Sequence, residues 1–137
     1  MIDIFVDASA LVPMVDARDQ WRPAVNRVLQ RLTAGGRYRL RTTNWTLYEA
    51  MALAKRRSHA LADGLYGWME ESDAIVTVSP IVELEALRRF RRWEDKSASV
   101  VDHANALVAL QLHCAAIISF DEDFQPLVAG TGIRLLR

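Results

Sequence analysis

Short apolar segments alternate with longer amphipathic segments along this chain, and this alternation constrains its fold most. The segments predicted to form strands are residues 2–6, 38–42, 74–78, 115–120 and 133–136. The segments predicted to form helices are one that begins at residue 8, then 21–33, 44 to about 57, 60–71, 80 to about 95, and 100–113. Strands that alternate with helices predict an α/β layer fold with a mostly parallel sheet.

The predicted helices begin at residues that commonly cap helix amino termini. Ser79 followed by Pro80 is the favoured order of a cap and a first helical residue. The Thr42-Thr43-Asn44 turn supplies cap chemistry for the helix that carries Glu49, and Ser97 or Ser99 can cap the helix that begins at residue 100. Pro13 is expected to limit or kink the first helix. We find neither repeats nor a linker, so residues 1–137 are expected to form one domain.

Composition narrows the classes of protein and of metal site. Cys114 is the only cysteine, and the three histidines lack the spacing of a zinc site, so any metal must be held by oxygen. No apolar run approaches the about 20 residues of a membrane span, and no signal peptide is evident, so we expect a soluble cytoplasmic protein without a membrane partner. The net charge is +0, which argues against non-specific coating of nucleic acid, although arginine-rich patches permit local phosphate contacts.

Four acidic residues occupy positions that can meet at one edge of the sheet. Asp7 and Asp121 each follow a predicted buried strand, and ligands of parallel sheets gather outside the carboxyl ends of the strands. Glu49 and Asp102 lie in the early turns of helices that can point to the same edge. Two carboxylates about 4 Å apart repel by roughly 4 kcal/mol at an effective dielectric of 20, so convergence requires cations.

A ring of carboxylates suits Mg²⁺ or Mn²⁺, which prefer oxygen ligands and keep several waters that can contact phosphate. A water activated by such a cation can attack phosphorus in line, while the cation neutralises charge on the leaving oxygen. The four acids therefore point to phosphodiester hydrolysis without a protein nucleophile.

Each acid also has a purely structural interpretation. Asp7 and Asp121 can be helix N-caps, and Asp102 can be a surface charge that stabilises a helix dipole. Thr46-Leu47-Tyr48-Glu49 matches the capping-box pattern, which makes Glu49 a candidate capping residue. Each signal taken singly is weak.

Four motifs surround these acids and span essentially the whole chain: Phe5-Val6-Asp7-Ala8-Ser9-Ala10-Leu11, Thr42-Thr43-Asn44 leading to Glu49, Val101-Asp102-His103-Ala104, and Ile118-Ser119-Phe120-Asp121-Glu122-Asp123-Phe124. Their order and context resemble the PIN-domain family, most closely the VapC-type toxins of type II toxin-antitoxin pairs. This resemblance implies a three-layer α/β/α PIN-like fold with a central sheet of about five strands.

The resemblance also implies a function and roles for individual residues. Asp7, Glu49, Asp102 and Asp121 fall on the family's acidic metal-binding quartet, and Asp123 falls where some members have an additional acid. Ser9 and Ser119 are assigned supporting roles, toward Asp7 and Asp121 respectively. The family implies Mg²⁺- or Mn²⁺-dependent cleavage of RNA, homodimerisation, and inhibition by a cognate antitoxin. One departure is that residues 98–101 lack a tryptophan that these toxins often have before the third acid.

Other functions were weighed against a toxin ribonuclease. A haloacid-dehalogenase phosphotransferase needs a second acid where Ser9 stands, and a response-regulator receiver needs a lysine after a late strand, whereas the only lysines are Lys55 and Lys96. Two alternatives stay open: a PIN-domain nuclease of RNA processing without an antitoxin, and a non-catalytic PIN-like module that binds RNA or protein. Retention of the four acids argues against the second, because clustered negative charge repels an anionic polymer.

Overall fold

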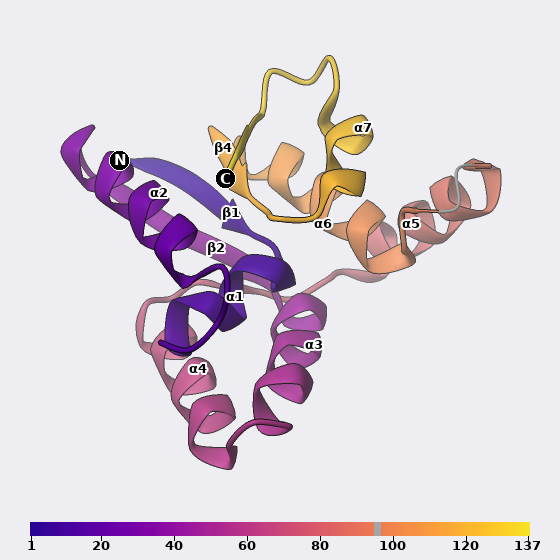
Figure 1. Cartoon of the computed structure of the whole chain (residues 1–137). Helices are drawn as coiled ribbons and strands as arrows, with labels where there is room; N and C mark the ends of the chain where they lie inside the picture. Colours follow the sequence, from indigo (N-terminus) through magenta and orange to yellow (C-terminus); the bar gives the residue numbers. More distant parts are fainter. Residues whose placement is uncertain (95–96) are drawn as a thin grey trace.

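The fold is an α/β arrangement around one parallel sheet, seen in a computed structural model that describes residues 1–94 and 97–137 (Figure 1). In the described residues the sheet has five strands in the order β3-β2-β1-β4-β5, and every neighbouring pair is parallel. The strands are β1 (Ile2–Val6), β2 (Tyr38–Thr43), β3 (Ile75–Val76), β4 (Ala116–Ile118) and β5 (Arg134–Leu136). This confirms the predicted fold class and the expected strand number.

The helices lie between the strands in sequence and cover the sheet in space. They are α1 (Ala8–Val15), α2 (Arg22–Ala34), α3 (Asn44–Lys55), α4 (His59–Glu71), α5 (Pro80–Arg92), α6 (Val100–Gln111) and α7 (Gln125–Val128), with a 3₁₀ turn at Glu122–Phe124. Thr43, Ser79 and Ser99 cap α3, α5 and α6 through their side chains, as their sequence positions predicted. Pro13 lies inside α1, which ends two residues later at Val15.

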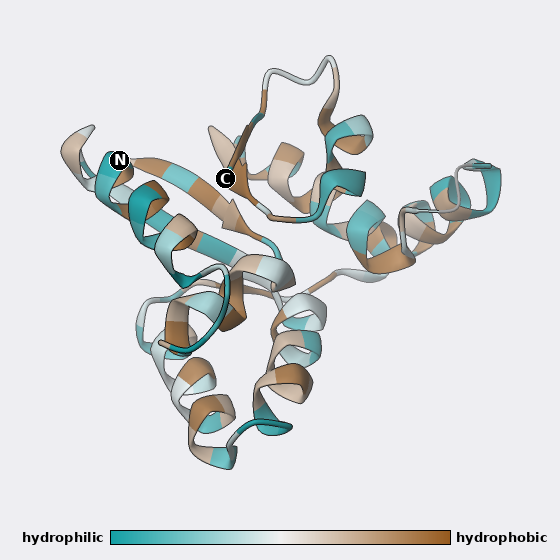
Figure 2. Ribbon diagram, viewed as in Figure 1, coloured by the Kyte–Doolittle hydropathy of each residue, from teal (hydrophilic) through white to brown (hydrophobic). Residues whose placement is uncertain are grey.

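The two faces of the sheet have separate apolar cores, which is what makes the fold three-layered. Ile4 and Val6 of β1 pack into a core with residues of α1 to α4, whereas Phe5 packs into a second core with residues of α5, α6 and α7. Because neighbouring strand residues point to opposite faces, a strand buried on both faces reads as a continuous apolar run. β1 is accordingly mostly brown in Figure 2, and its last three residues are buried.

Several observed elements are shorter than predicted, among them α3, which ends at Lys55 instead of about residue 57, and β5, which begins at Arg134 instead of residue 133. β3 has two residues instead of the predicted 74–78, because it is an edge strand and the Val78 N–H donates to the Asn44 side chain at 2.9 Å. β4 covers 116–118 of the predicted 115–120, and α6 ends at Gln111 before His113, which has a φ of 53°. The predicted end of the fifth helix at Asp95 lies outside the described residues; within them α5 ends at Arg92. In the part of the chain described here, no helix is long and apolar enough to cross a membrane.

Arg57 ties two loops together on the α1 side of the molecule. Its guanidinium contacts Asp16 at 2.5 Å and Asp19 at 3.0 Å, which joins the α1–α2 loop to the turn between α3 and α4. This contact holds the pKa of the Asp16 carboxyl below its usual range.

We expect Arg57→Ala to lower Tm at neutral pH, because two acids then lose their shared partner. The difference from the wild type should shrink as the pH falls through the lowered pKa of Asp16, since a protonated carboxyl no longer attracts the guanidinium. Thermal unfolding of both proteins between neutral and acid pH measures it, with the exposed Arg91 replaced by alanine as the control. A Tm difference that does not depend on pH would contradict this role.

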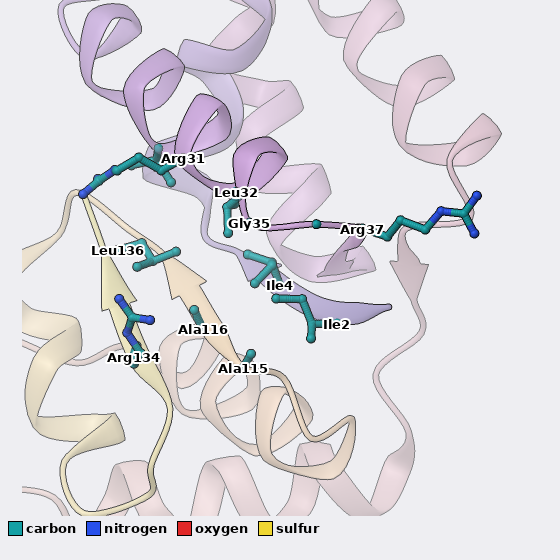
Figure 3. Close-up of a pocket in the computed structure, with 12 residues that line it drawn as sticks. Ile2, Ile4, Arg31, Leu32, Gly35, Arg37, Ala115, Ala116, Arg134 and Leu136 are labelled. Atoms are coloured by element: carbon teal, nitrogen blue, oxygen red, sulfur yellow. The ribbon is translucent and has the colours of Figure 1, made fainter.

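An apolar cavity of about 270 Å³ lies at the amino-terminal ends of β1 and β4, beneath the end of α2 (Figure 3). Ile4, Leu32, Ala116 and Leu136 form part of its wall. Arg31 and Arg37 stand at its rim, but their guanidinium groups point away from it in Figure 3. A ligand site needs convergent polar groups, and this mostly apolar cavity lies at the opposite end of the sheet from Asp7.

Candidate metal centre and active site

Asp7 occupies the carboxyl end of β1 and is the most buried of the four acids. Its backbone N–H donates to the Ile118 carbonyl at 3.0 Å, which continues the β1–β4 ladder and places the end of β4 beside it. Asp7 also holds the N-cap position of α1, but its side chain makes no cap hydrogen bond, so capping does not explain the carboxylate. The residue is only 5% exposed.

Two serine hydroxyls hold the Asp7 carboxylate in place. Ser9 and Ser119 both donate to Asp7 Oδ2, at 2.9 and 3.0 Å. Ser9 therefore stands where the sequence analysis placed it. Ser119 was expected to support the Asp121 side chain; instead it donates to Asp7, and it accepts only the backbone N–H of Asp121, at 3.1 Å. The hydroxyl is fully buried at the end of β4, where Asp7 is the acceptor within reach.

Glu49 lies on the exposed side of α3 and takes no part in capping. The side chain of Thr43 accepts the Thr46 N–H at 3.1 Å, so Thr43 is the N-cap and Thr46 is already inside the helix. The capping-box interpretation of Thr46 and Glu49 is therefore wrong. Glu49 stands one turn further along α3, where a structural reason for an acid is missing from the described contacts.

Asp102 combines a structural contact with its place near the other acids. Ser99 and Asp102 form a reciprocal capping box: the Ser99 N–H donates to Asp102 Oδ2 at 3.0 Å, and the Asp102 N–H donates to Ser99 Oγ at 3.1 Å. Asp102 thus has a structural role, but as a half-buried capping-box residue rather than as the surface charge on a helix dipole that was considered from the sequence. A carboxylate has two oxygens, so a cap bond to one of them leaves the other for a cation.

Asp121 and Asp123 lie on the turn that follows β4. The Asp123 N–H donates to Asp121 Oδ1 at 2.9 Å, which makes Asp121 the N-cap of the 3₁₀ turn Glu122–Phe124. Asp121 is half-buried and Asp123 is exposed.

Burial and the charges of neighbouring acids raise the pKa values of Glu49 and Asp102. Burial, then the charges of Asp7 and Asp102, raise the pKa of Glu49. Burial raises the pKa of Asp102, as do the charges of Asp7 and Asp121. Burial raises the pKa of Asp7 despite its hydroxyl partners. The structure therefore brings Asp7, Glu49, Asp102 and Asp121 to one edge of the sheet, where their charges repel.

Among the described residues, no basic side chain forms an ion pair with these four acids. Across the described residues the ion pairs involve other acids, Asp3, Asp16, Asp19, Glu85 and Glu122, and no lysine or arginine pairs with the four. Within the same residues, no three His, Cys, Asp or Glu side chains form a ready-made metal cage. The orientation of Asp102 and Asp121 explains part of the missing metal cage, because each carboxylate accepts a backbone N–H at its own helix start. The donor set consists of oxygen alone and fits Mg²⁺ or Mn²⁺ in kind.

Asn105 is a site-supporting residue that sequence reasoning missed. Its side-chain oxygen accepts the hydroxyls of Thr43 at 3.0 Å and of Thr46 at 2.8 Å, and all three residues are fully buried. The contact joins α6, one turn after Asp102, to the start of α3, which carries Glu49. A polar residue in an otherwise apolar helix stretch, Ala104 to Ala106, was the available signal.

His103 follows Asp102 but faces away from the acids. It is 2% exposed and packs edge-on against Phe90 at 6.5 Å and Trp93 at 5.3 Å between ring centroids. Burial and the charge of Arg89 lower its pKa, which favours the neutral ring. His103 therefore joins α5 to α6 rather than serving as a metal ligand.

A family model for the PIN domain matches residues 4–128. The chain belongs to the PIN-domain family. This confirms the resemblance inferred from the four motifs. No curated protein matches the chain by sequence.

Solved structures agree with this membership. VapC20 of Mycobacterium tuberculosis, described as a toxin that cleaves the sarcin-ricin loop, is 25% identical with a TM-score of 0.78, over 96% of this chain and 98% of that one. PAE2754 of Pyrobaculum aerophilum is 19% identical with a TM-score of 0.61, over 98% and 83%. FitAcB of Neisseria gonorrhoeae is 11% identical with a TM-score of 0.64, over 98% and 96%. At such identities the last two share the fold alone.

Proposed function

We propose that this PIN-domain protein is a divalent-metal-dependent endoribonuclease and the toxin of a toxin-antitoxin pair. The observation that carries the proposal is the cluster of Asp7, Glu49, Asp102 and Asp121, which converge at the carboxyl edge of the sheet without a cationic partner in the described residues. A protein that only binds RNA gains nothing from such a cluster. The similarity to VapC20, a toxin that cleaves RNA, supports both parts of the proposal.

Each acid would have a role that follows from its burial and its contacts. Asp7 is rigid, because two hydroxyls and the sheet hold it, so it suits the role of the ligand that fixes the cation. Glu49 is exposed and would face incoming substrate, while Asp102 and Asp121 would complete the donor set from helix starts. Asp123 would add a secondary donor. When bound, Mg²⁺ or Mn²⁺ supplies the positive charge that favours attack of water on the phosphodiester and stabilises the leaving oxygen.

The partners follow from the same family relationship. We propose RNA as the substrate and a cognate antitoxin as the inhibitor. A homodimer is the proposed assembly, with exposed aromatic residues such as Tyr48, Trp68 and Trp93 as candidates for these protein surfaces.

The test is cleavage of RNA by the purified protein. We expect a structured RNA, such as a sarcin-ricin hairpin, to be cleaved with Mg²⁺ or Mn²⁺ and to remain intact in EDTA, because the acids repel phosphate without a cation. Restoring the metal to the EDTA-treated protein should restore cleavage, which separates metal loss from damage. Cleavage that continues in EDTA would contradict the mechanism. RNA binding without cleavage under all these conditions would favour the non-catalytic module.

A further inference from the structure

Trp21 forms an aromatic surface beside the acid cluster. Its indole stacks on Phe120 with 5.0 Å between ring centroids and 5° between planes, and Phe120 immediately precedes Asp121. The Phe120 N–H donates to Ser9 Oγ at 2.9 Å, and Ser9 donates to Asp7. The stacked pair is therefore linked to Asp121 through the backbone and to Asp7 through the Ser9 hydroxyl.

The indole is exposed although it is held firmly. Phe120 is 9% exposed and covers one face of the ring, yet Trp21 remains 42% exposed, so its free area lies on the other face and edges. The backbone N–H of Trp21 donates to Asp19 Oδ1 at 2.8 Å, which fixes the main chain that carries the ring, and Asp19 Oδ2 is paired with Arg57 at 3.0 Å. A ring that is already ordered loses little conformational entropy when a ligand binds.

The exposed indole lines a hollow of about 330 Å³ that begins at Ser9. Ala8, Val12, Pro13 and Leu53 give it an apolar wall. Arg56 also lines it, and within the described residues no carboxylate forms an ion pair with this guanidinium. Asp19 is the acid in the wall, and Arg57 neutralises it.

We propose that this hollow holds one unpaired base of the RNA substrate, stacked on Trp21, with Arg56 at the adjoining phosphate. The inference rests on the proposed function and adds to it a residue that positions the substrate. A flat aromatic surface next to a free guanidinium matches single-stranded RNA, which proteins bind through stacked bases and neutralised phosphates. Trp21 would then select RNA with an extruded base beside the scissile bond.

The test measures binding of short fluorescein-labelled single-stranded RNAs in Mg²⁺ to Asp7→Asn protein, so that cleavage does not interfere. Adding Trp21→Ala should weaken binding of intact RNA about tenfold. Trp21→Phe keeps an aromatic ring stacked on Phe120, so its affinity for RNA should fall by less. Tyr66→Ala removes an aromatic ring of similar exposure (38%) on α4 and should leave binding unchanged.

RNAs that carry one abasic nucleotide separate stacking from a general loss of structure. For one abasic position the proteins with and without Trp21 should bind equally, because the base that stacks on the indole is gone. An equal loss from Trp21→Ala at every abasic position, or no loss on intact RNA, would overturn the proposal. Neither result bears on cleavage by the wild type, so the proposed ribonuclease function is judged separately.

Arg56 is tested by salt dependence. Arg56→Ala should weaken the binding of intact and abasic RNA equally. It should also reduce the slope of log K against log salt by the amount of about one phosphate contact. Arg37→Ala removes a guanidinium at the opposite end of the sheet and should leave the slope unchanged. An unchanged slope in Arg56→Ala would show that this arginine does not contact phosphate.

Discussion

Asp7→Asn is expected to abolish RNA cleavage and, at the same time, to raise the Tm of the metal-free protein. The amide oxygen can still accept from Ser9 and Ser119, so the fold should be kept. The buried negative charge that binds the cation is lost, and several kcal/mol of transition-state stabilisation corresponds to a fall of about 1,000-fold in rate. The higher Tm follows because an ionised carboxylate that is buried without a cation destabilises the metal-free fold.

The measurement pairs a cleavage assay with thermal unfolding in EDTA and in Mg²⁺. Wild-type Tm should rise on adding Mg²⁺, because a ligand that binds the folded state stabilises it, and the Asp7→Asn protein should lack this response. Asp63→Asn changes an exposed aspartate on α4 and serves as the control for charge removal. Unchanged cleavage by Asp7→Asn would refute the assignment of Asp7.

The stability difference should also depend on pH. The folded state raises the pKa of Asp7 above its ordinary value of 3.8, so the penalty of the ionised group is fully present above the raised pKa, shrinks as the pH falls below it, and vanishes only below the ordinary value. The higher Tm of metal-free Asp7→Asn should therefore be greatest at neutral pH and disappear in acid. If the Tm difference between the two proteins grows toward low pH, the fold stabilises Asp7 as the carboxylate. That result would contradict the absence of a basic partner for Asp7 among the described residues.

Asn105→Ala is expected to lower the free energy of unfolding by about 2–4 kcal/mol, a large share of the stability of a small domain. The substitution leaves two buried hydroxyls, of Thr43 and Thr46, without their acceptor and opens a small cavity. Cleavage should fall as well in the protein that remains folded, because α3 and α6 lose the contact that sets Glu49 relative to Asp102.

Urea unfolding measures this loss, with Asn26→Ala on the exposed side of α2 as the matched control. Cleavage is compared at a temperature at which the variant is folded by circular dichroism. A loss below about 0.5 kcal/mol, the range of ordinary surface substitutions, would show that the Asn105 contacts do not stabilise the fold.

Local chemistry explains which parts of the fold were predictable. Ser79 is predicted as a cap, and Thr43 and Ser99 are among the predicted cap candidates, because a hydroxyl that accepts a backbone N–H three residues later needs only neighbouring residues. The buried strands were recognised because burial on both faces requires an apolar run. The predicted ends of the strands were less accurate, as at β3. An edge strand ends where its hydrogen bonds to the neighbouring strand end, and its apolar residues can continue beyond that point.

The candidate site shows the same division. Thr43 and Thr46 are both possible N-caps of α3, and the sequence pattern does not tell which hydroxyl begins the helix. A capping role for Glu49 was therefore possible from the sequence, and the structure excludes it because Thr43 is the N-cap. The partner of Ser119 depended on which strands are neighbours, and β4 beside β1 places it at Asp7. The metal-binding roles of the four acids and of Asp123 stay predictions.

By itself the sequence determined the α/β class, the approximate starts of the capped helices and the positions of acids directly after buried strands, because these depend on contacts within a few residues. Only the tertiary structure decided that Glu49 and Asp102 approach Asp7, that Asn105 joins their helices, and that Trp21 stacks on Phe120. Those contacts join residues far apart in the chain, and their geometry depends on how every intervening element packs on the sheet.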